Sequence, residues 1–324
     1  MQMRRILLVV CALVMLVAAV PIHATTGPFV FVSNHASGQI LKIDASDGTT
    51  TVIYTEPEGF LPEDLVVGPD NKLYICDPSN NRILRMNQDG SDDETVYQSG
   101  TDPVKPQGPR FNAAGDLFFN TKGSTHSGIW RIPGIASFDF GYIPSTLVPV
   151  QVLTEAQTVS PGGEGLAFAN NGDLLIVDAA GEKVLRSLDP NFSSAAALIS
   201  SGLDAPTGIA RDMNNKIYIS NGGELNNIVK CNPDGTGCAE FVSFVAVGEE
   251  EVSDRPFYLE FTLDNTLFVA TTDVDGENGK LWRVDQSGVA TVVKELCLEE
   301  EDGFCGPAIG VAVEATSRAI TETY

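Results

Sequence analysis

The sequence is poor in histidine and in basic residues. Only three of its 324 residues are histidines, and one of them, His23, lies in the N-terminal segment considered below. Twenty lysines and arginines stand against 43 aspartates and glutamates, which gives a formal net charge of −23. Such an acidic surface repels nucleic acid and anionic lipid, so we expect neither as a partner.

Several catalytic signatures are missing as well. The chain contains no G-x-S-x-G turn, no phosphate-binding glycine loop and no H-E-x-x-H pair. Nucleophilic serine chemistry and zincin-type chemistry therefore have no support in the sequence. Long stretches with helical periodicity are also absent, which favours a fold built from strands.

One long apolar run is present, at the start of the chain. Arg4 and Arg5 precede the 15 residues "ILLVVCALVMLVAAV", and the segment "PIHA" that follows ends at Ala24. This order is typical of a secretory signal peptide over residues 1–24, and the run is short for a bilayer span. Lasting membrane insertion after cleavage is not expected, and the sequence predicts a secreted or periplasmic protein.

Five cysteines remain after this leader. Cys231 and Cys238 form one close pair, and Cys297 and Cys305 form another. In an oxidising compartment, such pairs indicate two local disulfides, and neither pair has the C-x₂₋₄-C spacing of zinc sites. The fifth, Cys76, lies within an apolar strand and is expected to be a buried small residue rather than a reactive thiol.

A repeat organises the rest of the chain. The segment "LYICD" at 73–77 has five counterparts, and the six copies follow one another at offsets of 43, 44, 57, 43 and 50 residues. This period range is typical of propeller blades. The counterparts are "VFVSN" from Val30, "LFFNT" from Leu117, "LLIVD" from Leu174, "IYISN" from Ile217 and "LFVAT" from Leu267.

Three further strands accompany each copy. A strand introduced by Pro or Gly precedes it, a strand with two apolar residues and a base follows it, and an outer strand ends the unit. The N-terminal copy lacks the preceding strand, whereas residues 306–315 form such a strand without a unit of its own. The sequence thus predicts an all-β, six-bladed β-propeller over residues 27–315, closed when the C-terminal strand completes the N-terminal blade. Residues 316–324 are expected to form a C-terminal tail or a partial extra strand.

Two polar positions recur in every unit. The first is the end of the "LYICD" strand, where Asp77 and its counterparts are short polar residues that can bond the following turn. The second is a base in the next strand, expected to contact an acidic neighbour or a backbone carbonyl. The turn counterparts are Asn34, Thr121, Asp178, Asn221 and Thr271, and the bases are Lys42, Arg85, Arg131, Arg186, Lys230 and Arg283.

The repeats resemble a known family. "PEDLVVGPDNKLYICDPSNNRILRMNQDG" resembles an NHL-type repeat, and "GEGLAFANNGDLLIVDAAGEKVLRSLD" is similar both to that repeat and to the gluconolactonase and regucalcin group of six-bladed propellers. The resemblance covers residues 27–315. It implies the fold but not the function, because this architecture hosts hydrolases, lyases, oxidoreductases and pure binding modules.

The resemblance also implies a place to look for a metal ion. Strand order puts the starts of the innermost strands on one face, and metal-dependent lactonase-like propellers hold a divalent cation there. Glu164 in "GEGL" and Glu63 in "PEDL" match such positions and are candidate ligands for Ca²⁺ or another divalent cation, with Glu164 also a catalytic candidate. The alternative is that both glutamates accept hydrogen bonds from inner-strand amides. The other blades depart from the family's acid-and-amide set, since they offer Gln107 or Gly108, Thr207, Phe257 and Ala308.

Two loops contain weaker candidates. Asp273, Asp275 and Glu277 in "TDVDGENG" resemble part of a calcium loop but lack its distal glutamate, so a solvated acidic turn is favoured. His126 in "NTKGSTHSG" is a second catalytic candidate, because a streptogramin-lyase-like propeller uses a loop histidine as general base. An exposed loop imidazole is the favoured interpretation.

Two functions follow from these patterns. The favoured one is a secreted, monomeric propeller that binds a small-molecule ligand or a protein partner on its acidic channel-mouth face. The other is a divalent-metal-dependent hydrolase of the lactonase or esterase type, with Glu63 and Glu164 as channel ligands. Whether the protein is an enzyme stays open at this point.

Overall fold

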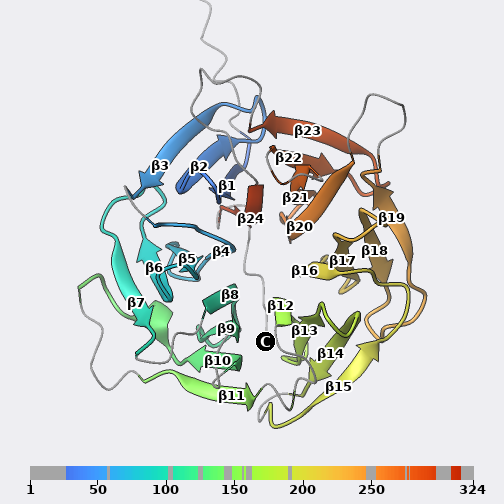
Figure 1. Cartoon of the computed structure of the whole chain (residues 1–324), viewed down its shortest axis with the longest axis horizontal. Helices are drawn as coiled ribbons and strands as arrows, with labels where there is room; N and C mark the ends of the chain where they lie inside the picture. Colours follow the sequence, from blue (N-terminus) through green and yellow to red (C-terminus); the bar gives the residue numbers. More distant parts are fainter. Residues whose placement is uncertain are drawn as a thin grey trace, which may run out of the picture.

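The computed structural model describes residues 27–56, 59–100, 105–122, 127–141, 148–154, 157, 163–188, 192–245, 253–273, 276, 278–296 and 308–314. Six four-stranded antiparallel sheets surround a central axis as the blades of a propeller (Figure 1). The predicted six-bladed β-propeller is therefore confirmed. In the described part of the chain, no helix is long and apolar enough to cross a membrane.

Each blade runs from an innermost to an outermost strand. Blade 1 contains β24 (Ala308–Val313), β1 (Phe29–Asn34), β2 (Gln39–Asp44) and β3 (Thr50–Thr55). Blade 2 contains β4 (Leu65–Val67), β5 (Leu73–Asp77), β6 (Arg82–Met86) and β7 (Glu94–Gln98). Blade 3 contains β8 (Lys105–Phe111), β9 (Leu117–Lys122), β10 (Gly128–Ile132) and β11 (Val150–Thr154).

The other three blades follow the same order. Blade 4 contains β12 (Gly163–Phe168), β13 (Leu174–Asp178), β14 (Lys183–Ser187) and β15 (Ala195–Ile199). Blade 5 contains β16 (Pro206–Arg211), β17 (Ile217–Asn221), β18 (Asn227–Cys231) and β19 (Ala239–Ser243). Blade 6 contains β20 (Asp254–Phe261), β21 (Leu267–Asp273), β22 (Gly279–Val284) and β23 (Ala290–Glu295).

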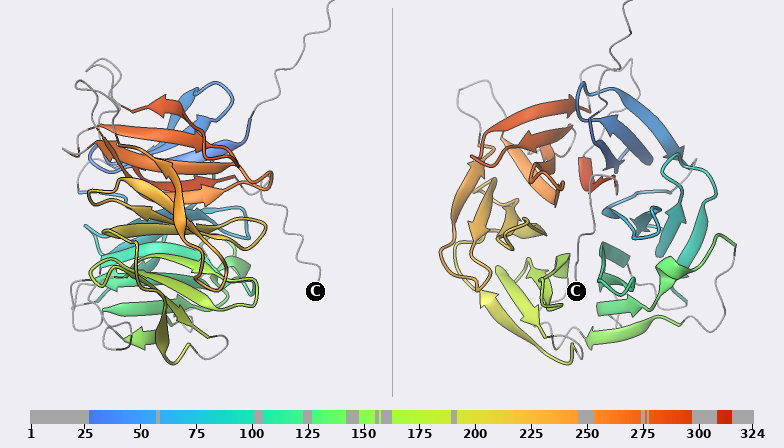
Figure 2. Two further views of the ribbon diagram at one scale, coloured as in Figure 1. Left: turned by 90° about the vertical axis from the view of Figure 1, so that its right-hand side faces the viewer. Right: turned by 180° about the vertical axis from the view of Figure 1, so that it is seen from behind.

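The two ends of the ring meet in blade 1. Strand β24 pairs with β1, with Val30 opposite Val313 and Val32 opposite Val311. The predicted closure is confirmed, and it removes two sheet edges that would otherwise be exposed. The inner strands contact one another in the order β24, β4, β8, β12, β16, β20 and back to β24, and they surround the central axis in the views from both faces (Figures 1 and 2).

Apolar side chains fill the spaces between neighbouring blades. Phe31 of blade 1 packs with Leu65 and Ile75 of blade 2, and Cys76 of blade 2 packs with Phe119 of blade 3. Cys76 is fully buried, as predicted, and burial raises the pKa of its thiol. It is therefore a packing residue that stays protonated.

A backbone seam joins successive inner strands. β-Bulges interrupt the pairing of β8, β12, β16 and β20 with their second strands. At the bulges of β8, β12 and β16, glycines pack directly on the next blade. A Cβ atom on Gly108 would lie 2.3 Å from the carbonyl oxygen of Glu164, and one on Gly208 would lie 2.4 Å from that of Phe257. Only glycine allows so close an approach.

Serine hydroxyls strengthen this seam at two places. Ser33 accepts a hydrogen bond from the amide of Gly310 over 2.7 Å and donates one to the carbonyl of Glu63. Ser220 does the same between the amide of Gly208, at 2.7 Å, and the carbonyl of Phe257. Each hydroxyl thus ties the amide at one inner strand to the carbonyl of the next.

The repeated strand-end residue has the predicted turn role. The Asp77 carboxylate accepts hydrogen bonds from the Ser79 hydroxyl at 2.7 Å, the Asn80 amide at 3.3 Å and the Arg82 Nε at 2.8 Å. Its counterpart Asp178 accepts one from the Gly181 amide at 2.8 Å. Asp77 is a structural residue.

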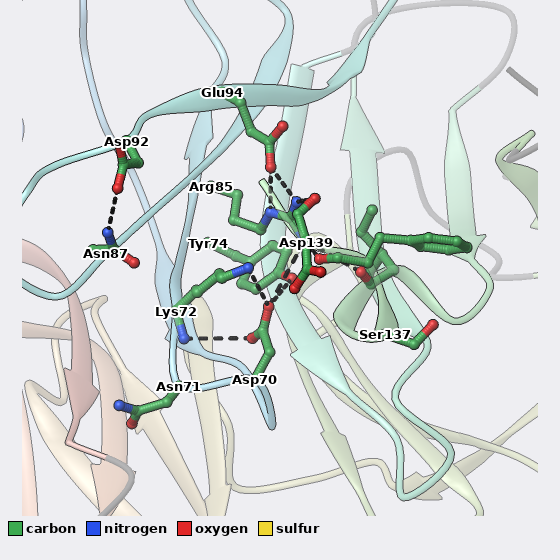
Figure 3. Close-up of polar contacts among 12 residues, drawn as sticks. Asp70, Asn71, Lys72, Tyr74, Arg85, Asn87, Asp92, Glu94, Ser137 and Asp139 are labelled. Atoms are coloured by element: carbon green, nitrogen blue, oxygen red, sulfur yellow. Dashed lines mark hydrogen bonds and ion pairs between the residues drawn. The ribbon is translucent and has the colours of Figure 1, made fainter. Parts of the chain in front are cut away.

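Arg85 of β6 connects blade 2 to blade 3 through an ion pair and hydrogen bonds (Figure 3). It is fully buried, pairs with Glu94, and donates to the carbonyl oxygens of Phe138 at 2.8 Å and Asp139 at 3.1 Å. These carbonyls follow the 3₁₀ turn η1 (Ile135–Ser137). The segment that follows β10 therefore folds back as local structure, with Phe140 beneath the Arg85 guanidinium, 5.1 Å from ring centroid to Cζ.

The repeated bases divide by blade. Arg131 and Arg186 approach acidic neighbours, Asp116 at 3.8 Å and Asp173 at 3.5 Å, as predicted. The ammonium groups of Lys42 and Lys230 instead lie over aromatic rings, 4.2 Å from the centroid of Phe29 and 5.0 Å from that of Tyr218. The recurring base thus contacts an acidic side chain, as Arg85, Arg131 and Arg186 do, or an aromatic ring, as Lys42 and Lys230 do.

We expect Arg85→Met to lower the free energy of unfolding by about 3 to 5 kcal/mol, because it leaves the partly buried Glu94 carboxylate and the loop carbonyls without the Arg85 donor. Arg283→Met, at the same repeat position but exposed, is the matched control and should change stability by less than about 0.5 kcal/mol. Urea unfolding followed by fluorescence measures the stability of both variants. Equal losses of stability would contradict the structural role of Arg85.

Gly208→Ala tests the seam. The added Cβ would meet the Phe257 carbonyl at 2.4 Å, so we expect a loss of about 1 to 3 kcal/mol although alanine restricts the unfolded chain more than glycine does. Gly100→Ala adds a methyl group with nothing within 4 Å and is the control. Comparable denaturation midpoints for the two variants would show that the close approach is not a constraint.

Candidate functional site

The register of the seam places one residue of each blade at an equivalent position, at the end of the ring where the inner strands begin. These residues stand just before the glycine position of the bulge, and they are half-buried or, for Gln107, 7% exposed. We call this ring the channel mouth. Its members, from blade 1 to blade 6, are Ile309, Glu63, Gln107, Glu164, Thr207 and Phe257.

The register corrects one predicted member of this ring. Ala308 pairs with Asn34, just as Pro206 pairs with Asn221 in blade 5, so Ala308 stands one position before the mouth and is fully buried. Ile309 takes the place that was assigned to Ala308. In blade 3, the structure likewise selects Gln107, because Gly108 forms the seam.

The mouth is polar on one side and apolar on the other. Blades 2 to 5 contribute Glu63, Gln107, Glu164 and Thr207 in consecutive order, which we call the polar arc. Blades 6 and 1 contribute Phe257 and Ile309, the apolar arc. An amphipathic opening of this kind is typical of sites that hold a small molecule.

Lys122, at the end of β9, supplies a cation that the sequence reasoning did not identify. Its ammonium group pairs with the carboxylate of Glu164, and beside it Gln107 donates its side-chain amide to Glu63. The position of Lys122 in the repeat could have identified it. Lys122 follows the turn residue Thr121 and lies opposite Lys105 in the register of β8 and β9. No other copy has a lysine or an arginine directly after the turn residue.

The two glutamates and Lys122 form one electrostatic unit. Burial raises the pKa of the Glu63 and Glu164 carboxyl groups, and the Lys122 ammonium offsets part of the rise at both. The charge of Glu63 also raises the pKa of Glu164. The charge of Lys122 therefore stabilises the ionised form of both carboxylates, but its ion pair is with Glu164.

Below the mouth, an arginine crosses the channel. Arg110 of β8 donates to the buried carboxylate of Asp64 over 2.9 Å, and its Nη2 lies 3.9 Å from the carboxylate of Glu260 on β20. Strands β8 and β20 face each other across the ring (Figure 1). Burial raises the pKa of Asp64 to about 6 in spite of Arg110.

Three buried polar atoms near the mouth have no hydrogen-bond partner within the described part of the chain. They are the hydroxyl of Tyr258, Oε1 of Gln107 and Nη2 of Arg110, which is ion-paired with Glu260 but lies beyond hydrogen-bond distance of it. Tyr258 is 1% exposed, and burial together with the charges of Glu164 and Asp64 raises the pKa of its hydroxyl. Because buried polar atoms are normally bonded, these three mark a place where a polar ligand group would gain partners.

The residues of the mouth do not fit a divalent metal ion. Ca²⁺ takes six to eight oxygen ligands, whereas here a lysine ammonium already pairs with one of the two candidate carboxylates. Over the residues that the structure describes, no group of three or more His, Cys, Asp or Glu side chains is arranged to hold a metal.

The other candidates stand apart from this site or outside the described residues. Asp273 accepts a hydrogen bond from the Asn278 side chain at 2.6 Å, within its own turn. Cys231 and Cys238 form the predicted disulfide. Five further candidates lie outside the described residues: His126, Asp275, Glu277, Cys297 and Cys305.

Comparison with known proteins supports the fold. No family model and no curated protein sequence matches the chain. Among solved structures, a chain of the nidogen/laminin complex is similar with a TM-score of 0.65 at 14% identity, over 89% of this chain and 98% of that chain. A gluconolactonase from Xanthomonas campestris has a TM-score of 0.60 at 13% identity, over 82% and 85% of the two chains.

A third similar structure is virginiamycin B lyase from Staphylococcus aureus, with a TM-score of 0.53 at 17% identity over 85% of each chain. At such identities, the similarity shows the propeller fold alone. The fold implied by the NHL-like and gluconolactonase-like repeats is confirmed.

The buried Asp64 gives the site a defined pH dependence. Its carboxyl has a pKa of about 6 in the folded chain against a reference value of 3.8, so between these values the folded state binds the proton more tightly. The contribution of Asp64 to stability is therefore complete below about pH 4 and falls as pH rises to about 6, by at most about 1.4 kcal/mol per pH unit.

Asp64→Asn removes this titration. We expect the difference in free energy of unfolding, variant minus wild type, to rise between pH 4 and pH 7 in urea titrations. A difference that falls over this range would mean that Arg110 dominates and that the pKa of Asp64 is lowered instead.

Proposed function

We propose that this chain is a secreted propeller that binds an uncharged, amphipathic small molecule at its channel mouth. The observation that carries this proposal is the division of the mouth into a polar arc and an apolar arc, with the Tyr258 hydroxyl and Oε1 of Gln107 buried beside it without a hydrogen bond. Such a site would orient a ligand by its polar groups and bind it mainly through its apolar side.

The charges of the mouth favour an uncharged ligand. Glu63 and Glu164 are opposed by Lys122, and Lys105 also acts on Glu63. An anion would meet two buried carboxylates, and a cation would compete with Lys122 for them. A neutral ligand with hydroxyl or amide groups can donate to the carboxylates and accept from the ammonium at the same time.

The apolar arc supplies the contact area. Phe257 and Ile309 are half-buried and sit side by side in blades 6 and 1, opposite the centre of the polar arc. Aromatic residues at the centre of a binding site commonly dominate its affinity. The ligand therefore presents an apolar flank to Phe257.

The proposed location rests on two features of the chain. The N-terminal residues have the order of a secretory signal peptide, and the disulfide between Cys231 and Cys238 is of the kind that persists in oxidising compartments. Both support export.

The test is a ligand screen read out on paired variants. Uncharged, anionic and cationic small molecules are screened by thermal shift, and the dissociation constants of binders are measured by calorimetry. We expect uncharged amphipathic binders, one per chain, whose affinity falls about tenfold or more in Phe257→Ala and in Gln107→Ala. Met213→Ala, at a 67% exposed residue of blade 5, should leave affinity unchanged.

Binding that survives both mouth substitutions would contradict the proposal, as would a screen in which only charged molecules bind. A protein that binds this face with affinity lost in Phe257→Ala, in the absence of any small-molecule binder, would assign the mouth to a macromolecular partner instead.

A further inference from the structure

We infer that Lys122 is the built-in cation of the channel mouth, and that its ammonium group takes the place a divalent metal ion would have between Glu63 and Glu164. The inference goes beyond the proposed function, because it concerns what holds the mouth together and does not depend on any ligand.

The order of the blades puts Lys122 between the two carboxylates. Glu63 belongs to blade 2 and Glu164 to blade 4, while Lys122 extends from the second strand of blade 3. Its ammonium pairs with Glu164, and its charge acts on Glu63 as well. Gln107 of the same blade binds Glu63 through its amide nitrogen. Blade 3 therefore supplies a donor to each of its acidic neighbours.

The burial of these groups makes a cation necessary. The side chains of Lys122 and Glu164 are 28% and 18% exposed. Two carboxylates that share such a site repel each other and lose hydration, so they need a positive charge nearby to stay ionised together. A divalent ion is the usual solution in a ring of oxygen ligands, and here an ammonium is in that position.

The same contacts exclude a second cation while Lys122 is present. A metal ion bound to Glu164 would lie within a few ångströms of the ammonium, and like charges at that separation repel strongly in a partly buried site. Removal of the ammonium changes this situation. The ring would then offer two carboxylates, Oε1 of Gln107 and the hydroxyl of Thr207, which are hard oxygen ligands that Ca²⁺ accepts.

Another lysine of the same repeat architecture serves as a matched control. Lys280 pairs with Asp254 at 3.1 Å, also in a partly buried setting, but the indole nitrogen of Trp282 donates to the same carboxylate at 3.2 Å. Lys280→Ala therefore leaves one carboxylate that keeps a donor, whereas Lys122→Ala takes the ion-pair partner from Glu164, whose pKa the charge of Glu63 also raises.

The experiment measures the melting temperature of the full mature chain in EDTA and with about 10 mM Ca²⁺, well above the weakest dissociation constants of extracellular calcium modules. Wild type is compared with four single variants and one double variant. The single variants are Lys122→Ala, Lys122→Arg, Lys280→Ala and Glu164→Gln, and the double variant combines Lys122→Ala with Glu164→Gln. The mouth response is the part of the Ca²⁺ shift that Glu164→Gln abolishes.

We expect no mouth response in wild type, Lys122→Arg or Lys280→Ala. Lys122→Ala should melt below wild type in EDTA and regain about 2 °C or more with Ca²⁺, and the double variant should lose that gain. A cooperative melting transition and a β-type circular dichroism spectrum confirm that each variant is folded.

Either of two results would overturn the inference. One is a mouth response in wild type or Lys122→Arg, since the metal would then bind with the cation in place. The other is a folded Lys122→Ala that gains no stability from Ca²⁺. If Lys122→Ala does not fold, Lys122→Met keeps the apolar stem and takes its place. Failure of the ligand screen would leave these readouts unchanged, so the two proposals are tested separately.

Discussion

The close approach of each inner strand to the next is the constraint on which this structure depends. At Gly108, Gly165, Gly208 and Gly310, the bulge lies so near the carbonyl of the following blade that a Cβ atom would come within 2.8 Å of it. This contact sets the spacing of the blades around the channel, and the serine bridges at Ser33 and Ser220 reinforce it. Because the carbonyl belongs to the mouth residue itself, the seam also fixes which side chain enters the mouth.

Two blades have a residue other than glycine at the seam position. Blades 2 and 6 have Asp64 and Tyr258 at the seam position, and both side chains are buried close to the channel groups. Asp64 pairs with Arg110, and the Tyr258 hydroxyl lies within the field of the mouth carboxylates. Four blades thus maintain the ring, while two contribute buried polar groups to the interior, which is how one repeat can support a scaffold and a site together.

Much of this architecture could be predicted from the sequence, because each blade repeats the same hydrophobic pattern and turn chemistry. The period predicted the six blades, the unpaired C-terminal strand predicted the closure, and the short polar residue in every copy predicted the turn role of Asp77. The site was harder to predict. A bulge shifts the register by one residue, so Ala308 was chosen where Ile309 belongs, and Lys122 was missed because its partner Glu164 is 42 residues away in the next blade.

The account therefore depends on a charge-balanced mouth in which a lysine, not a metal ion, stands between two glutamates. The most direct test is anomalous diffraction from crystals of the mature chain grown with Mn²⁺, refined to a resolution that places the Lys122 side chain. The account predicts that the Lys122 ammonium bonds Glu164 beside Glu63, with no anomalous peak in the mouth. A Mn²⁺ peak bonded to both glutamates, with Lys122 turned away, would contradict it.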